Sequence, residues 1–94
     1  MRLILKVEEV FDLTGRGLIL APKIPDNLGF AVRPKDRIQL RTPNRQRLDT
    51  HIASFSLGKP IGGGRTVVAI ALPSDIRRAD VPTGTEVWLL LPNE

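Results

Sequence analysis

The sequence predicts an all-β protein that folds as a small closed barrel of six strands. Eight glycines and eight prolines fall at nearly regular intervals and divide the 94 residues into short apolar pieces. None of these pieces keeps the i, i+3, i+4, i+7 spacing of an amphipathic helix, and several alternate or form Val/Ile/Leu blocks. A closed barrel removes the edges that apolar strands would otherwise leave open. The length suits one domain, residues 1–94.

The apolar pieces give the expected strands in chain order. They are Leu3–Phe11, Gly17–Ile24, Asp36–Thr42, Arg47–Leu57, Thr66–Leu72 and Thr85–Leu91. The segment SDIRRAD is expected to hold a single helical turn with Ser74 as its cap. No long helix is expected.

The first strand carries an irregularity near its acidic pair. Its apolar phase begins at Leu3 and would place Glu9 in the core and Val10 outside. A bulge near Glu8 and Glu9 would flip the phase and let the two glutamates project close together at the surface. The alternative is a strand that ends early.

The second strand begins at the end of Gly15-Arg16-Gly17, a motif that resembles a phosphate-binding loop. It lacks the third glycine of a dinucleotide fingerprint and the Gly-Lys-Ser/Thr of a Walker loop, and a strand follows it in place of a helix. We predict a corner between two strands, with Gly17 allowing a positive φ or a close backbone approach. The later loop LGKPIGGGRT also lacks a following helix and is predicted to be a flexible connection.

The third strand contains RIQLR, which alternates cleanly. Ile38 and Leu40 are predicted to face the core, and Arg37, Gln39 and Arg41 to face outward, because successive side chains on a strand point to opposite faces. The last two strands are apolar on both phases, which is typical of strands covered on both faces or only partly exposed.

Positive charge is concentrated in residues 33–47. The chain has 14 Lys and Arg against 10 acids, a net charge of +4. Six cations and Asp36 give this segment +5, so the rest of the chain nets −1. The cations are Arg33, Lys35, Arg37, Arg41, Arg45 and Arg47. Such a patch favours phosphate or an acidic protein surface. The alternative is a solvated strand edge kept charged against aggregation.

The aromatic residues are divided between the core and possible contact positions. Phe11 and Phe55 lie within apolar phases and are expected in the core. Phe30 and Trp88 are the candidates for stacking or for anchoring a partner, although core packing is the expected role of Trp88.

The sequence shows no catalytic or metal-binding group. It has no cysteine, which excludes disulfides, thiolate zinc sites and a cysteine nucleophile. His51 is the only histidine, and Asp49 could orient it on the same strand face, but a third catalytic member is missing. One histidine does not build a transition-metal site. We therefore predict a non-enzyme with no cofactor, metal or nucleotide.

The segment MRLILKVEEV is relevant to the cellular location of the protein. Its apolar run is short and broken by charges, so we expect neither a signal peptide nor a membrane span. A cytoplasmic protein with no membrane partner is the prediction, and the absence of cysteine fits a reducing compartment.

Three stretches together resemble one known family. VEEVFDLTGRGLIL, VRPKDRIQL and IALPSDIRRADVPTGTEVWLL resemble the second domain of translational GTPases, the β-barrel that follows the nucleotide domain in elongation factor Tu and its relatives. The shared features are an acidic pair before Val-Phe, Gly-Arg-Gly, Val-x-x-x-Asp before a strand and Asp-Val-x-x-Gly near the end. The resemblance spans nearly the whole sequence and implies a closed six-stranded Greek-key barrel.

In this family the barrel binds partners. In the factor that delivers aminoacyl-tRNA, the acidic pair helps form the pocket for the terminal adenosine, and the resemblance makes Glu8 and Glu9 the corresponding pocket-rim residues. Other members use the barrel against ribosomal RNA. The sequence also departs from the family: it carries no GTPase domain, Lys35 replaces the usual glycine before Asp36, and Glu9 stands where aspartate is common.

These observations lead to one functional prediction and one alternative. We predict a non-enzymatic binding module that contacts structured RNA, either tRNA or ribosomal, through its basic segment. The predicted contacts are Arg33, Lys35, Arg37, Arg41, Arg45 and Arg47. The alternative is a protein–protein interaction or oligomeric assembly module with no role in nucleic-acid binding.

Overall fold

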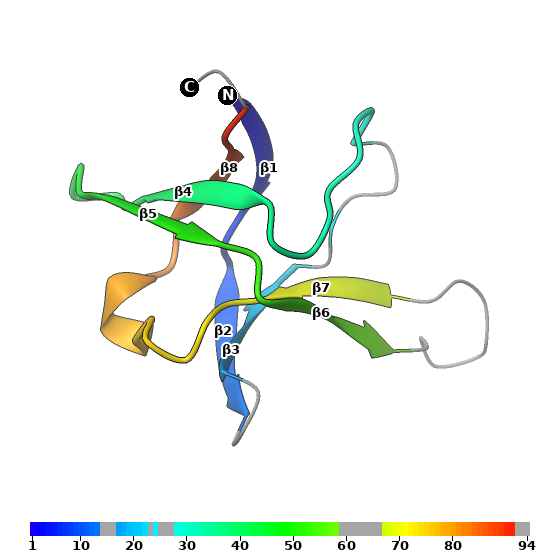
Figure 1. Ribbon diagram of the computed structural model, residues 1–94. Coiled ribbons are helices and arrows are strands. Elements are labelled where there is room, and N and C mark those ends of the chain that lie inside the picture. Colours follow the sequence, from blue (N-terminus) through cyan, green and yellow to red (C-terminus); the bar gives the residue numbers. More distant parts are fainter. Residues whose placement is uncertain (14–16, 23, 25–27, 59–66, 92–94) are drawn as a thin grey trace.

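The computed structural model describes residues 1–13, 17–22, 24, 28–58 and 67–91 (Figure 1). The all-β prediction is confirmed. The elements in chain order are β1 (Arg2–Lys6), β2 (Glu9–Leu13), β3 (Gly17–Ala21), β4 (Arg37–Arg41), β5 (Arg47–His51), β6 (Ser54–Gly58), β7 (Val67–Ala71), the short 3₁₀ helix η1 (Arg78–Asp80) and β8 (Glu86–Leu89). No helix among the described residues is long and apolar enough to cross a membrane.

The strands form two antiparallel sheets of four strands each. The first sheet has the order β1-β8-β4-β5 and the second the order β2-β3-β7-β6. In Figure 1 the β4–β5 hairpin of the first sheet lies above the β6–β7 hairpin of the second. Among the described residues the ladders make two sheets and no single closed ring, so the predicted six-stranded closure is not confirmed.

The first predicted strand, Leu3–Phe11, changes sheet halfway and is two strands. The backbone N–H of Val7 donates to the carbonyl of Thr85, just before β8, at 2.7 Å. The N–H of Glu8 donates to the carbonyl of Ala21 on β3 at 2.8 Å. The chain therefore leaves the first sheet and enters the second within one residue.

The fourth predicted strand, Arg47–Leu57, behaves in the same way. The N–H of Ile52 donates to the carbonyl of Asp36 at 2.9 Å, next to β4. The N–H of Ala53 donates to the carbonyl of Ala71 on β7 at 3.0 Å. At two corners, one continuous segment thus provides an edge strand to each sheet, as in packings whose strands switch sheets at bends.

The first strand does contain a bulge, but it lies earlier than predicted. The pairing of β1 with β8 shifts register between Leu3 and Leu5, so the placement near Glu8 and Glu9 was wrong. The extra residue lets Ile4 and Leu5 both point inward, and they are only 2% and 4% exposed. At the acidic pair the strand breaks because the chain changes sheet there.

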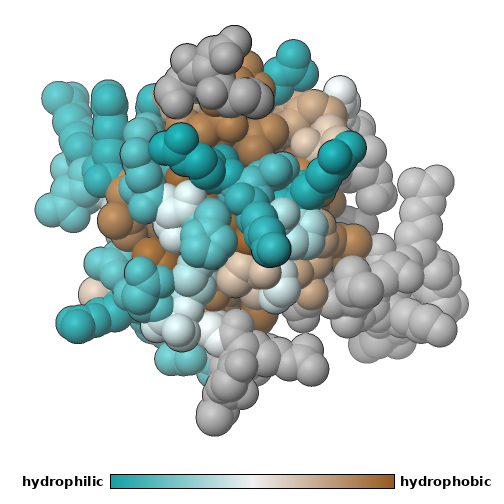
Figure 2. All heavy atoms as spheres, viewed as in Figure 1, coloured by the Kyte–Doolittle hydropathy of each residue, from teal (hydrophilic) through white to brown (hydrophobic). Residues whose placement is uncertain are grey.

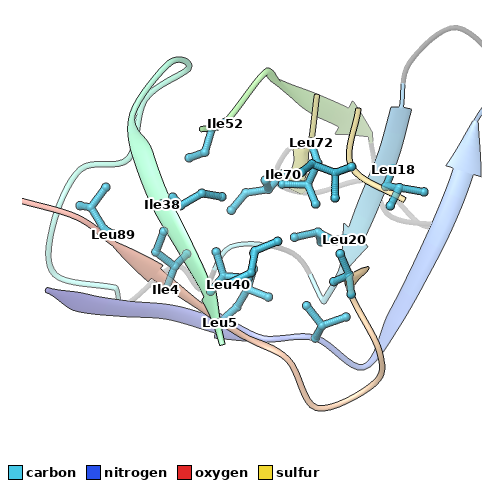
Figure 3. Packing of buried hydrophobic residues seen from close by; sticks show 14 residues of the cluster. Ile4, Leu5, Leu18, Leu20, Ile38, Leu40, Ile52, Ile70, Leu72 and Leu89 are labelled. Atoms are coloured by element: carbon cyan, nitrogen blue, oxygen red, sulfur yellow. The ribbon is translucent and has the colours of Figure 1, made fainter. Parts of the chain in front are cut away.

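The core fills the space between the two sheets. Figure 3 shows aliphatic side chains from both sheets pointing into a shared interior, among them Ile38 and Leu40 of β4, Leu20 of β3 and Ile70 of β7. The predicted inward direction of Ile38 and Leu40 is confirmed, since both are fully buried. Because side chains alternate along a strand, the other residues of β4, Arg37, Gln39 and Arg41, face outward.

Among the aromatic residues, Phe11 differs from the prediction. Phe11 was expected in the core but is 46% exposed. The sheet change before β2 shifts the phase, so Val10 packs against the core and Phe11 faces out on an edge strand. Phe30 and Phe55 are partly buried against the core, and Trp88 is half-buried.

Gly17 behaves as the corner prediction requires. Its φ is +75°, and a Cβ atom at this position would collide with the carbonyl oxygen of Leu72. A side chain is therefore excluded both by conformation and by space. Gly15, Arg16 and most of the loop LGKPIGGGRT lie outside the described residues. The single helical turn expected in SDIRRAD is η1, whose N-cap position is Arg77 and not Ser74.

Candidate functional site

All six predicted cations belong to the β4–β5 hairpin or to the turn that leads into it. Arg33 and Lys35 lie in that turn, Arg37 and Arg41 begin and end β4, Arg45 lies in the connecting turn and Arg47 begins β5. Figure 2 shows hydrophilic side chains gathered at the left of the view, over this hairpin. The fold therefore brings the predicted residues onto one supersecondary unit.

The outer face of the hairpin is built from alternate residues of β4 and β5. In the antiparallel register Arg37 lies opposite His51, and Arg41 lies opposite Arg47. Arg37, Arg47 and His51 are exposed, while Arg41 is half-buried. Two arginines side by side at one end are unfavourable for the free protein unless an anion or a neighbouring group offsets their repulsion.

Arg41 is engaged within the protein. Its guanidinium carbon lies 5.1 Å from the centre of the Trp88 ring, in cation–π geometry. Its Nε donates to Gln39 Oε1 at 2.8 Å, and its Nη2 lies 3.4 Å from Met1 Sδ. The indole N–H of Trp88 in turn donates to Glu86 Oε1 at 3.2 Å. Trp88 therefore packs beneath Arg41 and is not an open stacking platform.

The middle of the hairpin separates the cations into two clusters. Gln39 Nε2 donates to Asp49 Oδ1 at 2.9 Å across the β4–β5 ladder, so a carboxylate occupies the centre of the face. We name the turn cluster (Arg33, Lys35 and Arg37) and the tip cluster (Arg41, Arg45 and Arg47). The rise of a strand places the two ends of β4 about 13 Å apart.

Five of the six cations have no side-chain partner among the residues that the structure describes. Within the described part of the chain, no hydrogen bond, ion pair or ring contact involves the side chains of Arg33, Lys35, Arg37, Arg45 or Arg47. The nearby acids are used elsewhere: Asp36 accepts from the backbone N–H of Arg33 at 2.9 Å, and Asp49 from Gln39. The positive charge of this surface is thus available to an outside anion.

An open hollow lies at the tip cluster. It has a volume of about 240 Å³ and is lined by Arg41, Thr42, Arg45, Gln46, Arg47 and Glu86. Three of these lining residues are arginines, a residue type suited to the planar, bidentate recognition of a phosphate. Glu86 is held by Trp88 at one side.

Glu8 and Glu9 lie at the first corner, where the chain passes from β1 to β2. Both are exposed and line a second open hollow of about 410 Å³. The other lining residues are Val10, Arg78, Val81, Pro82 and Thr83. Arg78 was not predicted from the sequence, although the doubled arginine in SDIRRAD, beside a predicted turn, was a signal for it.

The other two candidates from the sequence, Asp49 and His51, both lie on β5. Asp49 bonds to Gln39, and His51 is exposed and lies opposite Arg37. No group of three or more His, Cys, Asp or Glu residues that could hold a metal ion occurs in the parts of the chain that the structure describes.

Comparison with known proteins finds no match to a protein-family model, to a curated protein or to a solved structure. The resemblance to the second domain of translational GTPases rests on the sequence motifs and stays a prediction.

Proposed function

We propose that this protein is a non-enzymatic, cytoplasmic binding module that contacts structured RNA, either tRNA or ribosomal, through the β4–β5 hairpin. The observation that carries the proposal is the row of exposed cations whose side chains have no partner among the described residues. A single solvated charge on a surface costs little free energy. Five positive charges around one hairpin, however, raise the electrostatic potential of that surface and attract a polyanion.

The arrangement of the charges favours a backbone over a single small anion. The turn cluster and the tip cluster lie at opposite ends of β4, and Asp49 between them repels phosphate. Contacts would therefore fall on separate phosphates of one strand or of two neighbouring strands. Phosphate contacts position a nucleic acid without reading its bases, so little sequence preference is expected.

We further propose that the two sheets together form the six-stranded barrel of the translation-factor type. The sheet order supports this interpretation when each corner segment is treated as one bent strand. Counting β1 with β2 and β5 with β6 gives a ring of six: β1/β2, β8, β4, β5/β6, β7 and β3. Bent corner strands are a recognised way to connect two packed sheets.

The hollow beside Glu8 and Glu9 is a second proposed contact for the same RNA. Ionised carboxylates accept hydrogen bonds from hydroxyl and amino groups, both of which an RNA terminus presents. Val10, Val81 and Pro82 add an apolar lining, and Arg78 offsets part of the negative charge.

The proposal is tested by measuring the affinity of labelled bulk tRNA at about 50 mM salt and above. Changing Arg37 and Arg47 to alanine removes two exposed cations whose side chains make no hydrogen bond or ring contact with the described residues. We expect affinity to fall and the slope of log K against log salt to decrease by about 1 for each residue. Undetectable binding of the unchanged protein, or equal affinity of the double variant, would refute the proposal.

An assembly module is the second candidate, because apolar side chains are exposed near Trp88. Leu3 lies opposite Trp88 on β1 and is 42% exposed, and Met1 and Leu91 are each 37% exposed. Such residues could pack against another protein or a second copy. Hydrodynamic size separates the two candidates, since a monomer that binds tRNA argues against assembly.

A further inference from the structure

Two described residues other than glycine adopt the left-handed backbone conformation. They are Lys35, with φ 74°, and Arg45, with φ 68°. The other described residues with positive φ are Gly17, Gly29 and Gly84. A positive φ brings the Cβ atom of an L-residue close to the following carbonyl, which costs free energy that glycine avoids.

Lys35 occupies the third position of a tight turn. The turn runs from Arg33 to Asp36, and the N–H of Asp36 donates to the carbonyl of Arg33 at 3.2 Å. Pro34 at the second position and a positive φ at the third are the features of a type II turn, in which the third residue is usually glycine. The N–H of Lys35 also donates to the carbonyl of Ile52 at 2.7 Å, which ties the turn to the second corner.

Arg45 ends the turn Thr42–Arg45 in the β4–β5 connection, and its φ is also positive. Its N–H donates to the carbonyl of Thr42 at 3.0 Å, and the N–H of Thr42 donates to the carbonyl of Gln46 at 2.9 Å. A turn followed by one left-handed residue is a common hairpin connection, and glycine is the usual residue at that position.

No side-chain interaction of Lys35 or Arg45 with the described residues offsets this free-energy cost. Lys35 and Arg45 are both exposed, and neither side chain has a partner among the residues that the structure describes. Asparagine, which tolerates the left-handed region better, would serve the backbone at lower cost. Strain that the fold does not need points to a functional reason for the residue.

We propose that Lys35 and Arg45 are the two phosphate anchors of the RNA-binding surface, one at each end of β4. This inference rests on the proposed function and names the residues on which affinity depends most. Each anchor lies in a turn closed by backbone hydrogen bonds, so its charged group can be bound with little further loss of backbone freedom.

The experiment compares Lys35→Asn and Arg45→Asn with Lys35→Arg and Arg45→Lys. The first pair removes charge and keeps a residue suited to the backbone, and the second pair keeps both charge and strain. Arg77→Gln is the matched control: it removes one exposed charge outside the hairpin. Affinity for labelled bulk tRNA is measured over a range of salt, and urea unfolding is measured for each variant.

We expect each asparagine variant to bind tRNA at least about fivefold more weakly and to reduce the salt slope by about 1. Their urea midpoints should equal or exceed that of the unchanged protein, because strain is relieved. The charge-retaining variants should bind within about twofold of the unchanged protein, and so should Arg77→Gln.

The outcomes separate this inference from the proposed function. Absence of tRNA binding by the unchanged protein overturns both. If Arg37→Ala and Arg47→Ala weaken binding while the asparagine variants do not, the anchor assignment alone is overturned. A clearly lower urea midpoint for the asparagine variants also overturns it, because the side chains would then serve the fold.

Discussion

The two corners at which the chain changes sheet are alike in backbone and different in side chains. At each corner a buried aliphatic residue ends one sheet, Val7 at the first and Ile52 at the second, with exposures of 1% and 0%. The next residue, Glu8 or Ala53, is exposed and hydrogen-bonds into the other sheet. The bend is therefore made by one buried anchor followed by one outward residue.

The corners differ in the two residues that come directly after each buried anchor. The first corner presents two adjacent carboxylates to a hollow, whereas the second presents Ala53 and Ser54. Because the second corner makes the same change of sheet with small neutral residues, the bend does not require acidic side chains. The identity of Glu8 and Glu9 is therefore free to serve the pocket-rim role that the resemblance implies for them.

The largest expected effect is loss of the buried anchors. We expect Ile52→Ala to lower the free energy of unfolding by about 3 kcal/mol and Val7→Ala by about 2 kcal/mol, because each leaves a cavity in the core and valine loses fewer buried atoms. Urea unfolding followed by Trp88 fluorescence measures both. Leu3→Ala, at an exposed position of β1, is the control and should cost less than either. A smaller loss at Ile52 than at Leu3 would contradict the shared role of the anchors.

A smaller effect is expected at Thr85, which accepts a hydrogen bond from Val7 at the first corner. Its hydroxyl donates to the carbonyl of Pro82 at 2.6 Å, and its own carbonyl accepts from the N–H of Val7. We expect Thr85→Val to lower the free energy of unfolding by about 1 kcal/mol, since one partly buried hydrogen bond is lost at nearly constant volume. Thr83→Val, which is exposed, should change it by less than about 0.5 kcal/mol. Equal effects of the two variants would show that the hydroxyl is not needed.

The smallest effect on stability is expected from the acidic pair itself. Changing Glu8 and Glu9 to glutamine keeps their shape and removes both charges. Because neither side chain has a partner among the described residues, the free energy of unfolding should stay within about 0.5 kcal/mol in urea unfolding. If the free energy of unfolding fell by much more than this, the first corner would depend on its carboxylates. The two corners would then differ in what stabilises them.

Part of the fold could be predicted because local pattern decides it. The alternation around Ile38 and Leu40 predicted a strand with one buried face. The corner at Gly17 was predicted because a strand, and not a helix, follows Gly15-Arg16-Gly17. The two changes of sheet were missed because no glycine or proline marks Val7 or Ile52. The residues on both sides of each corner favour extended backbone. The two halves of the segment differ only in the strand with which each one pairs, and that depends on residues distant in the sequence.

The candidate site was predictable to a similar extent. Charge density in the sequence located the hairpin, but it treated its six cations as equivalent. Arg41 is set apart by Trp88, which comes from β8 and is distant in sequence. Lys35 and Arg45 are set apart by backbone conformation, although Lys35 already stood out in the sequence at a position where the family it resembles carries glycine.

The pairing of β1 with β8 has a consequence for the order of folding. This ladder joins Arg2 to Leu89, the most distant pair of strands along the chain, whereas β2–β3, β4–β5 and β6–β7 are neighbours in sequence. Closing so long a loop loses more chain entropy than forming a hairpin. The hairpins can therefore form first, and the ladder that unites the first and last strands belongs to the slow part of the reaction.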